Sequence, residues 1–429
     1  MTYQETLKYL YSRLPMFSQV GISAYKKDIT NTILLCDSIG NPQNKFKSIH
    51  IAGTNGKGST SHMLAAIMQT AGYKTGLYTS PHLKDFRERI RVNGIMCDKD
   101  FVIDFVQKIK SKIKSIQPSF FEVTVAMAFD YFAKQKVEIA IIETGLGGRL
   151  DSTNIIKPII SVITNIGFDH MDILGNTLPE IAFEKAGIIK KNIPIVVGET
   201  LPTTKQVFIN KALQENASIS FAEENYTLIN LSANHKHQSI VFKENDEIEN
   251  EKIEIDLLGK YQTKNLFTVL EVCKQLNKLG FNLSQTIITS ALSQTSSLTG
   301  LLGRWQIIQE NPLIILDVAH NKDGVTQIIQ QLQQTSYQNL HCIFGMVKDK
   351  DHDAVLQLLP KKAKYYFTQA HIERALPCEV LQEKAKQFNL KGNFYADVNK
   401  AIESAKSNAK PNDLIIVFGS VFLIGEVNY

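Results

Sequence analysis

A short turn rich in glycine has the composition best suited to chemistry in this chain. Lys57 is flanked by Gly56 and Gly58, Gly53 opens the turn, and the hydroxyl of Ser59 closes it. Glycines let backbone N–H groups come close to an anion, and a lysine ammonium neutralises the charge of terminal phosphates. A hydroxyl at this place can ligate a metal ion. The turn therefore predicts a phosphate-binding loop.

The turn departs from the general phosphate-binding pattern at two places. Ile51 stands where that pattern has its first glycine, and Gly58 separates Lys57 from the hydroxyl residue. A helix directly after the turn would add about 0.3–1 kcal/mol of favourable dipole interaction with an anion. A glycine-rich turn with an incidental lysine is the alternative interpretation. Nucleotide binding is the hypothesis that the rest of the chain must support.

Three further polar residues each follow a predicted strand. Ser80, Glu143 and His170 offer a hydroxyl, a carboxylate and an imidazole. Magnesium bound with ATP takes one or two protein oxygens and several waters, so a histidine ligand is unusual. The spacing leaves another interpretation open, in which Ser80 caps a turn, Glu143 pairs with Arg149 and His170 is an ordinary loop histidine.

A second polar cluster lies late in the chain. Asp317 ends an apolar strand and is followed by His320 and Asn321, an arrangement typical of ligand contact at a strand end. The same pattern suits a capped helix with Asp317 buried for structural reasons. A guanine-specific switch protein would need Asn-Lys-x-Asp, and Gly324 stands where that aspartate is required.

The elements that must position these groups alternate between strand and helix. Apolar runs predict strands at residues 48–52, 75–80, 137–142, 159–164 and 193–197. Amphipathic patterns predict helices at residues 3–14, 28–39, 59–71, 99–114, 124–134 and 178–186. Such alternation predicts a doubly wound parallel sheet, whose strands gather ligand groups at their carboxyl ends. We therefore expect Lys57, Ser80, Glu143 and His170 to share one sheet edge.

The later chain predicts an added meander and a second domain. Alternating patterns at residues 225–231, 239–243 and 252–257 predict a small antiparallel meander, and residues 262–279 and 284–293 predict helices. Residues 293–300 are small and polar, so we predict a flexible domain boundary there. The fold class is α/β: a P-loop-type doubly wound, mostly parallel domain over residues 1–296, and a smaller Rossmann-like domain over residues 297–429.

Composition limits the classes of partner. The chain has 429 residues and a net charge of +5, which suits small anionic substrates and gives no reason to expect nucleic acid. The run at residues 87–91 is basic but interrupted, so a solvated surface stays an alternative interpretation for it. The five cysteines lack CxxC spacing, which argues for reduced thiols and against a zinc site. No apolar run reaches the ~18 residues of a membrane helix. We expect a cytoplasmic protein without a membrane partner.

The ordered motifs of the chain resemble a known family. HIAGTNGKGST, TSPHLKDFRERIRVNG, ETGLGGRLDSTN, TNIGFDHMDILGNT, EKAGIIK, GRW and DVAHN occur in this order along nearly the whole chain. Together they resemble the folylpolyglutamate synthase/dihydrofolate synthase family of the Mur ligase superfamily. The resemblance implies an ATP-dependent ligase that adds L-glutamate to dihydropteroate, to the terminal glutamate of a folate, or to both. We expect it to be a monomer.

The resemblance also implies roles for individual residues. It implies that the nucleotide is bound by Thr54, Asn55, Gly56, Lys57, Gly58, Ser59, Asn265, Arg304, Asp317, His320 and Asn321. It implies that two magnesium ions are held by Ser80, Glu143, His170 and a carbamylated Lys185. It implies that the pterin-bearing substrate contacts Ser119, Phe120, Phe121, Glu122, Leu150, Asp151 and Ser152.

The implied reaction activates a carboxylate. The γ-phosphoryl group of ATP is transferred to the acid, the amine of glutamate attacks the acyl phosphate, and phosphate leaves. Lys57, Lys185 and His170 are the implied catalytic residues. From the residues alone, Lys185 fits an exposed helix lysine better, and the aromatic pair Phe120-Phe121 fits a core better than a pterin contact.

Two other functions compete with this interpretation. A cell-wall ligase that extends a UDP-linked peptide would carry a UDP-binding domain before the loop, and only 52 residues precede Gly53 here, fewer than the ~100 of a usual domain. A nucleotide-dependent switch would hydrolyse ATP without an acceptor acid. Formation of a glutamate-lengthened product separates the ligase from both.

Overall fold

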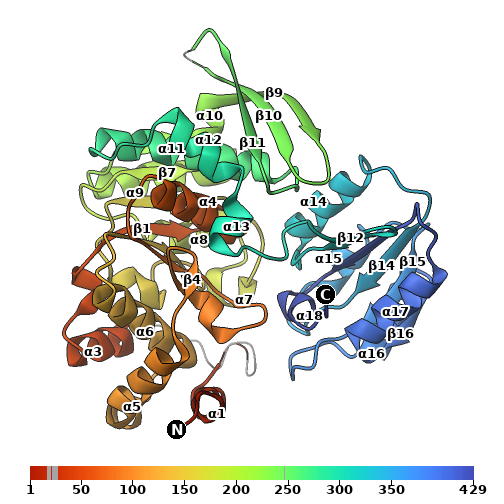
Figure 1. Cartoon of the computed structure of the whole chain (residues 1–429), viewed down its shortest axis with the longest axis horizontal. Helices are drawn as coiled ribbons and strands as arrows, with labels where there is room; N and C mark the ends of the chain where they lie inside the picture. The colour runs from red at the N-terminus through yellow and green to blue at the C-terminus, as the bar shows by residue number, and fades with distance from the viewer. Residues whose placement is uncertain (17–20, 22–27, 246) are drawn as a thin grey trace. The chain divides into compact units, whose positions relative to one another are not determined.

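The structure is a computed structural model that describes residues 1–16, 21, 28–245 and 247–429. The chain forms two compact units (Figure 1). Unit 1 comprises Met1–Asp256 and Gln262–Leu301, and unit 2 comprises Leu257–Tyr261 and Leu302–Tyr429. The predicted domain limits, residues 1–296 and 297–429, stay a prediction of where independently folding domains end.

Unit 1 is built on a sheet of eight strands in the order β4-β3-β2-β5-β1-β6-β7-β8. The strands are β1 (Lys47–Ala52), β2 (Thr75–Tyr78), β3 (Ile90–Val92), β4 (Ile95–Met96), β5 (Ile139–Glu143), β6 (Ile160–Ile163), β7 (Ile195–Val197) and β8 (Ile219–Phe221). From β2 to β8 all neighbours are parallel, whereas β3 and β4 pair antiparallel at one edge. The predicted doubly wound, mostly parallel sheet is confirmed.

Helices cover the faces of this sheet, and loops lie at the ends of its strands. They are α1 (Tyr3–Arg13), α3 (Thr30–Ser38), α4 (Lys57–Thr70), α5 (Lys99–Ile116), α6 (Phe120–Lys134), α7 (Met171–Leu174), α8 (Leu178–Ala186), α9 (Pro202–Gln214), α10 (Ala222–Asn225), α11 (Gln262–Lys278), α12 (Gln285–Leu292) and α13 (Thr295–Thr299). None of the described helices is long and apolar enough to cross a bilayer. All five cysteines are free and buried.

The helix that follows the glycine turn is α4, and it is buried on almost every side. It packs against β1, β2 and β5 and against α11, α12 and α13. Gly56 is its N-cap in a left-handed conformation (φ 84°), so the first helical residue is Lys57 and not Ser59, near which we predicted the start. This packing fixes the position of the α4 N-terminus.

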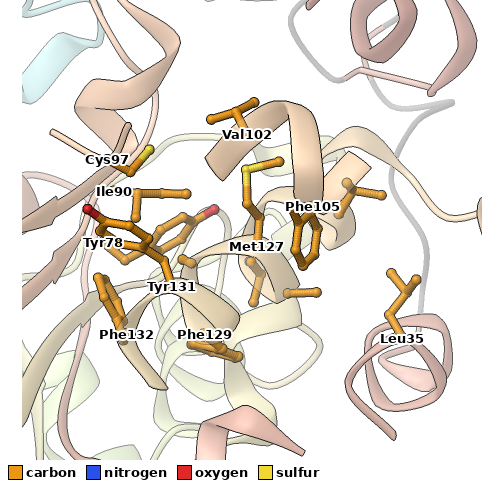
Figure 2. Close-up of a cluster of buried hydrophobic side chains, with 14 of the residues drawn as sticks. Leu35, Tyr78, Ile90, Cys97, Val102, Phe105, Met127, Phe129, Tyr131 and Phe132 are labelled. Carbon is orange, nitrogen blue, oxygen red and sulfur yellow. The ribbon is translucent and has the colours of Figure 1, made fainter. Parts of the chain in front are cut away.

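A large apolar cluster lies where α5 and α6 meet β2 and β3. Figure 2 shows Val102 and Phe105 of α5 with Met127 and Phe132 of α6, all fully buried. Tyr78 of β2 is in the same cluster, and its hydroxyl is 3.2 Å from the Thr124 hydroxyl, so its polar end is paired inside the core. This core fixes the position of the strands that carry the polar residues of the edge.

The antiparallel meander is confirmed as β9 (Tyr226–Ala233), β10 (Gln238–Glu244) and β11 (Asn250–Ile255). The stretch at residues 293–300, which we predicted to be flexible, is mostly helical because α13 occupies most of it, and its role as a domain boundary stays a prediction. Thr295 and Thr299 are fully buried, and the Thr299 hydroxyl accepts or donates a 2.8 Å hydrogen bond with His62 Nδ1 of α4. Small polar residues therefore mark a tight helix contact here.

Unit 2 is a smaller α/β sheet in the order β12-β13-β17-β14-β15-β16. Its strands are β12 (Gln306–Glu310), β13 (Leu313–Leu316), β14 (Leu340–Phe344), β15 (Lys364–Thr368), β16 (Gly392–Tyr395) and β17 (Leu414–Phe418). Its helices are α14 (Lys322–Leu332), α15 (His352–Leu356), α16 (Cys378–Gln387), α17 (Val398–Asn408) and α18 (Val421–Gly425). The smaller α/β sheet is confirmed, and β12, an antiparallel edge strand, was not predicted.

Candidate active site at the carboxyl edge of the larger sheet

Four adjacent parallel strands bring the predicted residues to one edge of unit 1. In the order β2-β5-β1-β6, Ser80 follows β2, Glu143 ends β5, the glycine turn follows β1, and His170 follows β6. The backbone N–H of Ser80 donates to the Glu143 carboxylate at 3.4 Å, so these two residues are neighbours. The shared edge agrees with the strand alternation, whereas the chemical role of each residue stays a prediction.

Two glycines of the turn are required by their surroundings. Gly53 has φ 150°, and a Cβ there would lie 1.9 Å from Thr164 Oγ1. Gly56 has φ 84°, and a Cβ there would lie 2.3 Å from Asn265 Oδ1. Both positions combine a backbone conformation that side chains rarely adopt with a neighbour at clashing distance. Close approach of the β6 loop and of α11 therefore shapes the turn.

The first amides of the turn hold the loop instead of facing a ligand. The Thr54 N–H donates to the Asn165 carbonyl at 3.1 Å, and the Asn55 N–H donates to Asn165 Oδ1 at 2.8 Å. Thr54 Oγ1 donates to the Gly167 carbonyl at 3.1 Å. The first turn of a helix has N–H groups without intrahelical partners. The N–H groups at the start of α4, which includes Lys57, Gly58 and Ser59, are therefore the ones that we expect to donate to an anion.

Two lysine ammonium groups share one carbonyl beneath the turn. Lys57 Nζ and Lys185 Nζ each donate to the Gly53 carbonyl oxygen at 2.9 Å, and Lys57 Nζ also donates to the Thr54 carbonyl at 3.2 Å. Lys185 is only 3% exposed, so the exposed-lysine interpretation is wrong. Burial, and then the charge of Lys57, lower the pKa of Lys185 to about 7, against the opposing charges of Asp169 and Asp151. A neutral amine is thereby accessible at ordinary pH.

The predicted metal ligands form an oxygen-poor set. Glu143 is 4% exposed, and His170 sits in a left-handed conformation (φ 52°) as the N-cap of α7, with its Nε2 3.9 Å from Asp169 Oδ2. Within the described ranges no group of three or more His, Cys, Asp or Glu residues forms a metal cluster. Because ATP-bound magnesium needs only one or two protein oxygens, Glu143 and Ser80 remain a chemically suitable pair.

Three arginines near this edge differ from their sequence interpretation. The basic run is not a solvated face, because Arg89 and Arg91 are 7% and 8% exposed. Arg89 Nε donates to His82 Nδ1 at 2.7 Å, and its guanidinium lies 5.3 Å from the centre of the Phe120 ring. Arg149 forms an ion pair with Glu184 at 2.8 Å. These contacts tie the loops after β2 and β5 to neighbouring helices.

The first predicted substrate segment begins α6. Ser119 and Glu122 form a capping box, in which Ser119 N donates to Glu122 Oε2 at 2.6 Å and Glu122 N donates to Ser119 Oγ at 3.3 Å. Phe120 is 2% exposed in the apolar core, as an aromatic core pair would be. Phe121 is half-buried, and its ring lies so close to Gly145 that a Cβ there would be 2.4 Å away. Phe121 is thus the member of the pair that faces the Glu143 loop.

The second predicted substrate segment is centred on a buried carboxylate. Asp151 accepts hydrogen bonds from the Thr153 hydroxyl (2.5 Å) and N–H (3.0 Å) and from the Leu146 N–H (2.8 Å). Burial raises its pKa against these hydrogen bonds. Leu150 is half-buried and Ser152 is buried. The Asp151 carboxylate therefore holds the loop after Glu143 in shape.

The predicted nucleotide residues of unit 2 are bound to their own loops. Asp317 accepts from Tyr261 Oη (2.8 Å), the Trp305 N–H (2.9 Å) and the Ala319 N–H (2.9 Å), and burial raises its pKa. Asn321 caps α14 by accepting from the Gly324 N–H at 2.8 Å. The remaining two make local contacts to carbonyls: His320 Nδ1 to Val318 O at 2.9 Å and Arg304 Nη1 to Gly303 O at 3.2 Å. This geometry agrees with the capped-helix alternative.

Sequence reasoning missed three residues of the unit 1 edge. Asn165 holds the turn, Asp169 lies beside His170, and Gln262 donates to Ser59 Oγ at 3.1 Å. Asn165 and Asp169 follow β6, so their position after a buried strand could have indicated them. Gln262 gives no comparable signal, because its contact with Ser59 spans 203 residues.

The chain matches known proteins over its whole length. Residues 51–273 match the Mur ligase middle domain, and residues 303–421 match the Mur ligase glutamate ligase domain. The dihydrofolate synthase/folylpolyglutamate synthase of Bacillus subtilis (strain 168) is 34% identical over 436 residues, which cover 99% of this chain and 98% of that protein.

Solved structures agree with these matches. E. coli FolC in complex with DHPP and ADP is 28% identical with a TM-score of 0.84, covering 99% of this chain and 96% of that one. The bifunctional folylpolyglutamate synthase/dihydrofolate synthase of Yersinia pestis, complexed with AMPPNP and a Mn ion, is 27% identical with a TM-score of 0.83, covering 99% and 97%. The resemblance seen in the motifs is confirmed. The chain belongs to the folylpolyglutamate synthase/dihydrofolate synthase family, and its two matched domains are of the Mur ligase type.

Proposed function

We propose that this protein is an ATP-dependent ligase that adds L-glutamate to dihydropteroate, to the terminal glutamate of a (tetrahydro)folate, or to both, and releases ADP and phosphate. Family membership supports the reaction class. The observation that carries the proposal is the strand order β2-β5-β1-β6, which brings Ser80, Glu143, the Lys57 turn and His170 to one edge.

The charge arrangement at the turn suits phosphoryl transfer to a carboxylate. A carboxylate is a poor electrophile, so it must be converted to an acyl phosphate before an amine can displace phosphate. Lys57, at the start of α4, would neutralise the negative charge of the phosphoryl group during its transfer. Its Nζ is already held at the loop by hydrogen bonds to the Gly53 and Thr54 carbonyls. Holding the acid, the phosphoryl group and the amine in line supplies much of the remaining acceleration.

Lys185 would act as a carbamate. Its neutral amine can attack carbon dioxide, forming an N–C bond and releasing one proton, which converts the neutral amine into a buried anion. The lowered pKa of Lys185 and its 3% exposure support this change, because a neutral amine is the reactive form. The product would carry two oxygens, which enrich the oxygen-poor ligand set of Glu143, Ser80 and His170.

Two magnesium ions, which would be held by these residues, supply charge stabilisation to the transferring phosphoryl group. The buried Glu143 carboxylate beside Ser80 fits one such ion. The Mn ion and AMPPNP in the Yersinia pestis structure support a divalent ion together with ATP. DHPP and ADP in E. coli FolC support a pterin-bearing acid as the acceptor.

Product formation tests the proposal directly. Purified protein would receive ATP, magnesium and glutamate with dihydropteroate, tetrahydrofolate or a UDP-muramyl peptide, and both ADP and the lengthened product would be measured. We expect acceptor-dependent ADP release with one or both pterin acids. Extension of the UDP-muramyl peptide, or ADP release without any acceptor, would contradict the proposal.

A further inference from the structure

A buried glutamine joins two predicted nucleotide residues that lie on different elements. Gln262 is the first residue of α11 and is fully buried. Its Nε2 donates to Ser59 Oγ of α4 at 3.1 Å, and its Oε1 accepts from Asn265 Nδ2 at 2.7 Å. One amide side chain thus spans from the glycine-turn helix to α11.

The hydrogen bonds define which groups remain available for a ligand. Because Gln262 occupies an acceptor position of Ser59 Oγ, the Ser59 proton must point away from Gln262. Because Asn265 gives its Nδ2 group to Gln262, its Oδ1 atom is the end that faces Gly56. Gln262 therefore sets the direction of a hydroxyl proton and of an amide oxygen beside the turn.

We propose that Gln262 is a positioning residue for the nucleotide, acting through Ser59 and Asn265. The inference rests on the proposed function, since it takes the turn to bind the phosphates of ATP. The Ser59 hydroxyl, held by Gln262, donates to a phosphate oxygen, and the Asn265 amide is kept from rotating. The burial of Gln262 matters because a buried amide exchanges its partners only at the cost of unmade hydrogen bonds.

Two substitutions of Gln262 remove the hydrogen bond that it donates to Ser59 while nearly keeping the packing of its side chain. Gln262→Glu keeps the shape but cannot donate to Ser59 Oγ, and its carboxylate would draw the Ser59 proton away from the phosphates. Gln262→Met keeps the volume and removes both hydrogen bonds. Gln331→Met is the matched control in unit 2, because Gln331 is also buried and bonds twice, from the Lys260 N–H at 2.9 Å and to the Leu258 carbonyl at 3.5 Å.

Nucleotide affinity measured against pterin affinity tests the proposal. Calorimetry would give the Kd for ADP with magnesium, and steady-state kinetics would give KM for ATP and for the pterin acid. For both Gln262 variants we expect ADP to bind about tenfold more weakly, since a hydrogen bond to a charged group is weakened. KM for ATP should rise in parallel, and KM for the pterin acid should stay within about twofold, as for Gln331→Met.

A double substitution shows whether Gln262 acts through Ser59. If it does, Gln262→Met should weaken ADP binding less in a Ser59→Ala background than in the natural chain. Folded Gln262 variants with unchanged ADP affinity, or an equal loss of affinity in Gln331→Met, would overturn the inference. A natural chain that binds no nucleotide would instead overturn the proposed function, so the two failures are distinguishable.

Discussion

The two sheets of this protein end their parallel strands in different ways. At the edge of the unit 1 sheet, Lys57 and Lys185 bring two amines to the one Gly53 carbonyl. At the corresponding strand end of unit 2, the Asp317 carboxylate accepts three hydrogen bonds from its own surroundings. At these two strand ends, unit 1 therefore brings two like charges to one acceptor, whereas unit 2 holds a carboxylate whose hydrogen bonds are satisfied.

This difference suggests that the unit 1 edge takes part in the reaction, whereas the unit 2 edge stabilises its own fold. Two amines that compete for one acceptor are held at a free-energy cost, which an arriving anion relieves. A carboxylate with three local donors already has its best partners, and a ligand must displace or share them. Substitutions at the unit 1 edge should therefore change the reaction, and those at the unit 2 edge should first change stability.

The largest effect is expected for Lys57→Ala. Loss of the ammonium removes the cation that follows the transferred phosphoryl group, so kcat should fall by ~10³-fold or more. The fold should be kept, because Lys57 is half-buried and its bonds within the described residues go to backbone carbonyls of the same turn. Turnover with a pterin acid and a circular dichroism melt would measure both. Turnover that stays near the natural rate would remove the turn from the mechanism.

Lys185→Ala should cause the next largest loss and should be open to chemical rescue. Without the carbamate the variant is expected to be nearly inactive, and added acetate or formate should restore part of the rate by supplying carboxylate oxygens. Lys190→Ala is the control, since Lys190 follows α8 and bonds to the Asn154 carbonyl at 3.2 Å. Full activity of Lys185→Ala without any additive would contradict the carbamate.

The shared edge could be predicted because it depends on local patterns. Ser80, Glu143 and the glycine turn each follow an apolar run, and parallel strands align their carboxyl ends. The roles implied for them needed the family resemblance, because a hydroxyl, a carboxylate and an imidazole at strand ends also suit ordinary loops. Spacing thus predicted that these residues share an edge, whereas their chemistry stays a prediction.

Contacts distant in the sequence could not be predicted. The bond from Gln262 to Ser59 spans 203 residues, and that from Lys185 to Gly53 spans 132. For Lys185 a partial signal exists, since it lies on the same face of α8 as the buried Ile181 and Ala182. A lysine on an apolar stripe is a better candidate for burial than its charge suggests.

Asp317→Asn sharpens the comparison from the side of unit 2. Asparagine has one carbonyl oxygen for the three donors, so an N–H of Trp305 or Ala319 would face an amide N–H. We expect the free energy of unfolding of unit 2 to fall by about 1–3 kcal/mol. The decrease in kcat should be much smaller than that caused by Lys57→Ala. Denaturant unfolding would measure the stability, and steady-state kinetics would measure kcat and the KM for ATP. The exposed N-cap Asp351 offers a control in Asp351→Asn, since asparagine caps equally well.

A kinetic loss in Asp317→Asn as large as that of Lys57→Ala, with stability unchanged, would reverse the assignment of chemistry to unit 1 and scaffolding to unit 2. That outcome would favour the direct nucleotide contact that the family resemblance implies for Asp317.

The smallest expected effect is a change in how stability depends on pH below neutrality, and it concerns two buried histidines. His50 of β1 is fully buried, with its Nε2 2.8 Å from the Thr153 hydroxyl, and burial, with the nearby charge of Lys190, lowers its pKa to about 3. Below the ordinary histidine pKa of about 6.5, this imidazole is protonated in the unfolded chain but stays neutral in the folded chain. The free energy of unfolding therefore falls as the pH falls, by up to ~1.4 kcal/mol per pH unit. Burial also lowers the pKa of His341, but Asp413, 3.4 Å away, opposes the shift. In denaturant unfolding between pH 5 and 8, His50→Gln should therefore flatten the acid slope more than His341→Gln does, and equal slopes would show that the carboxylate partner makes no difference.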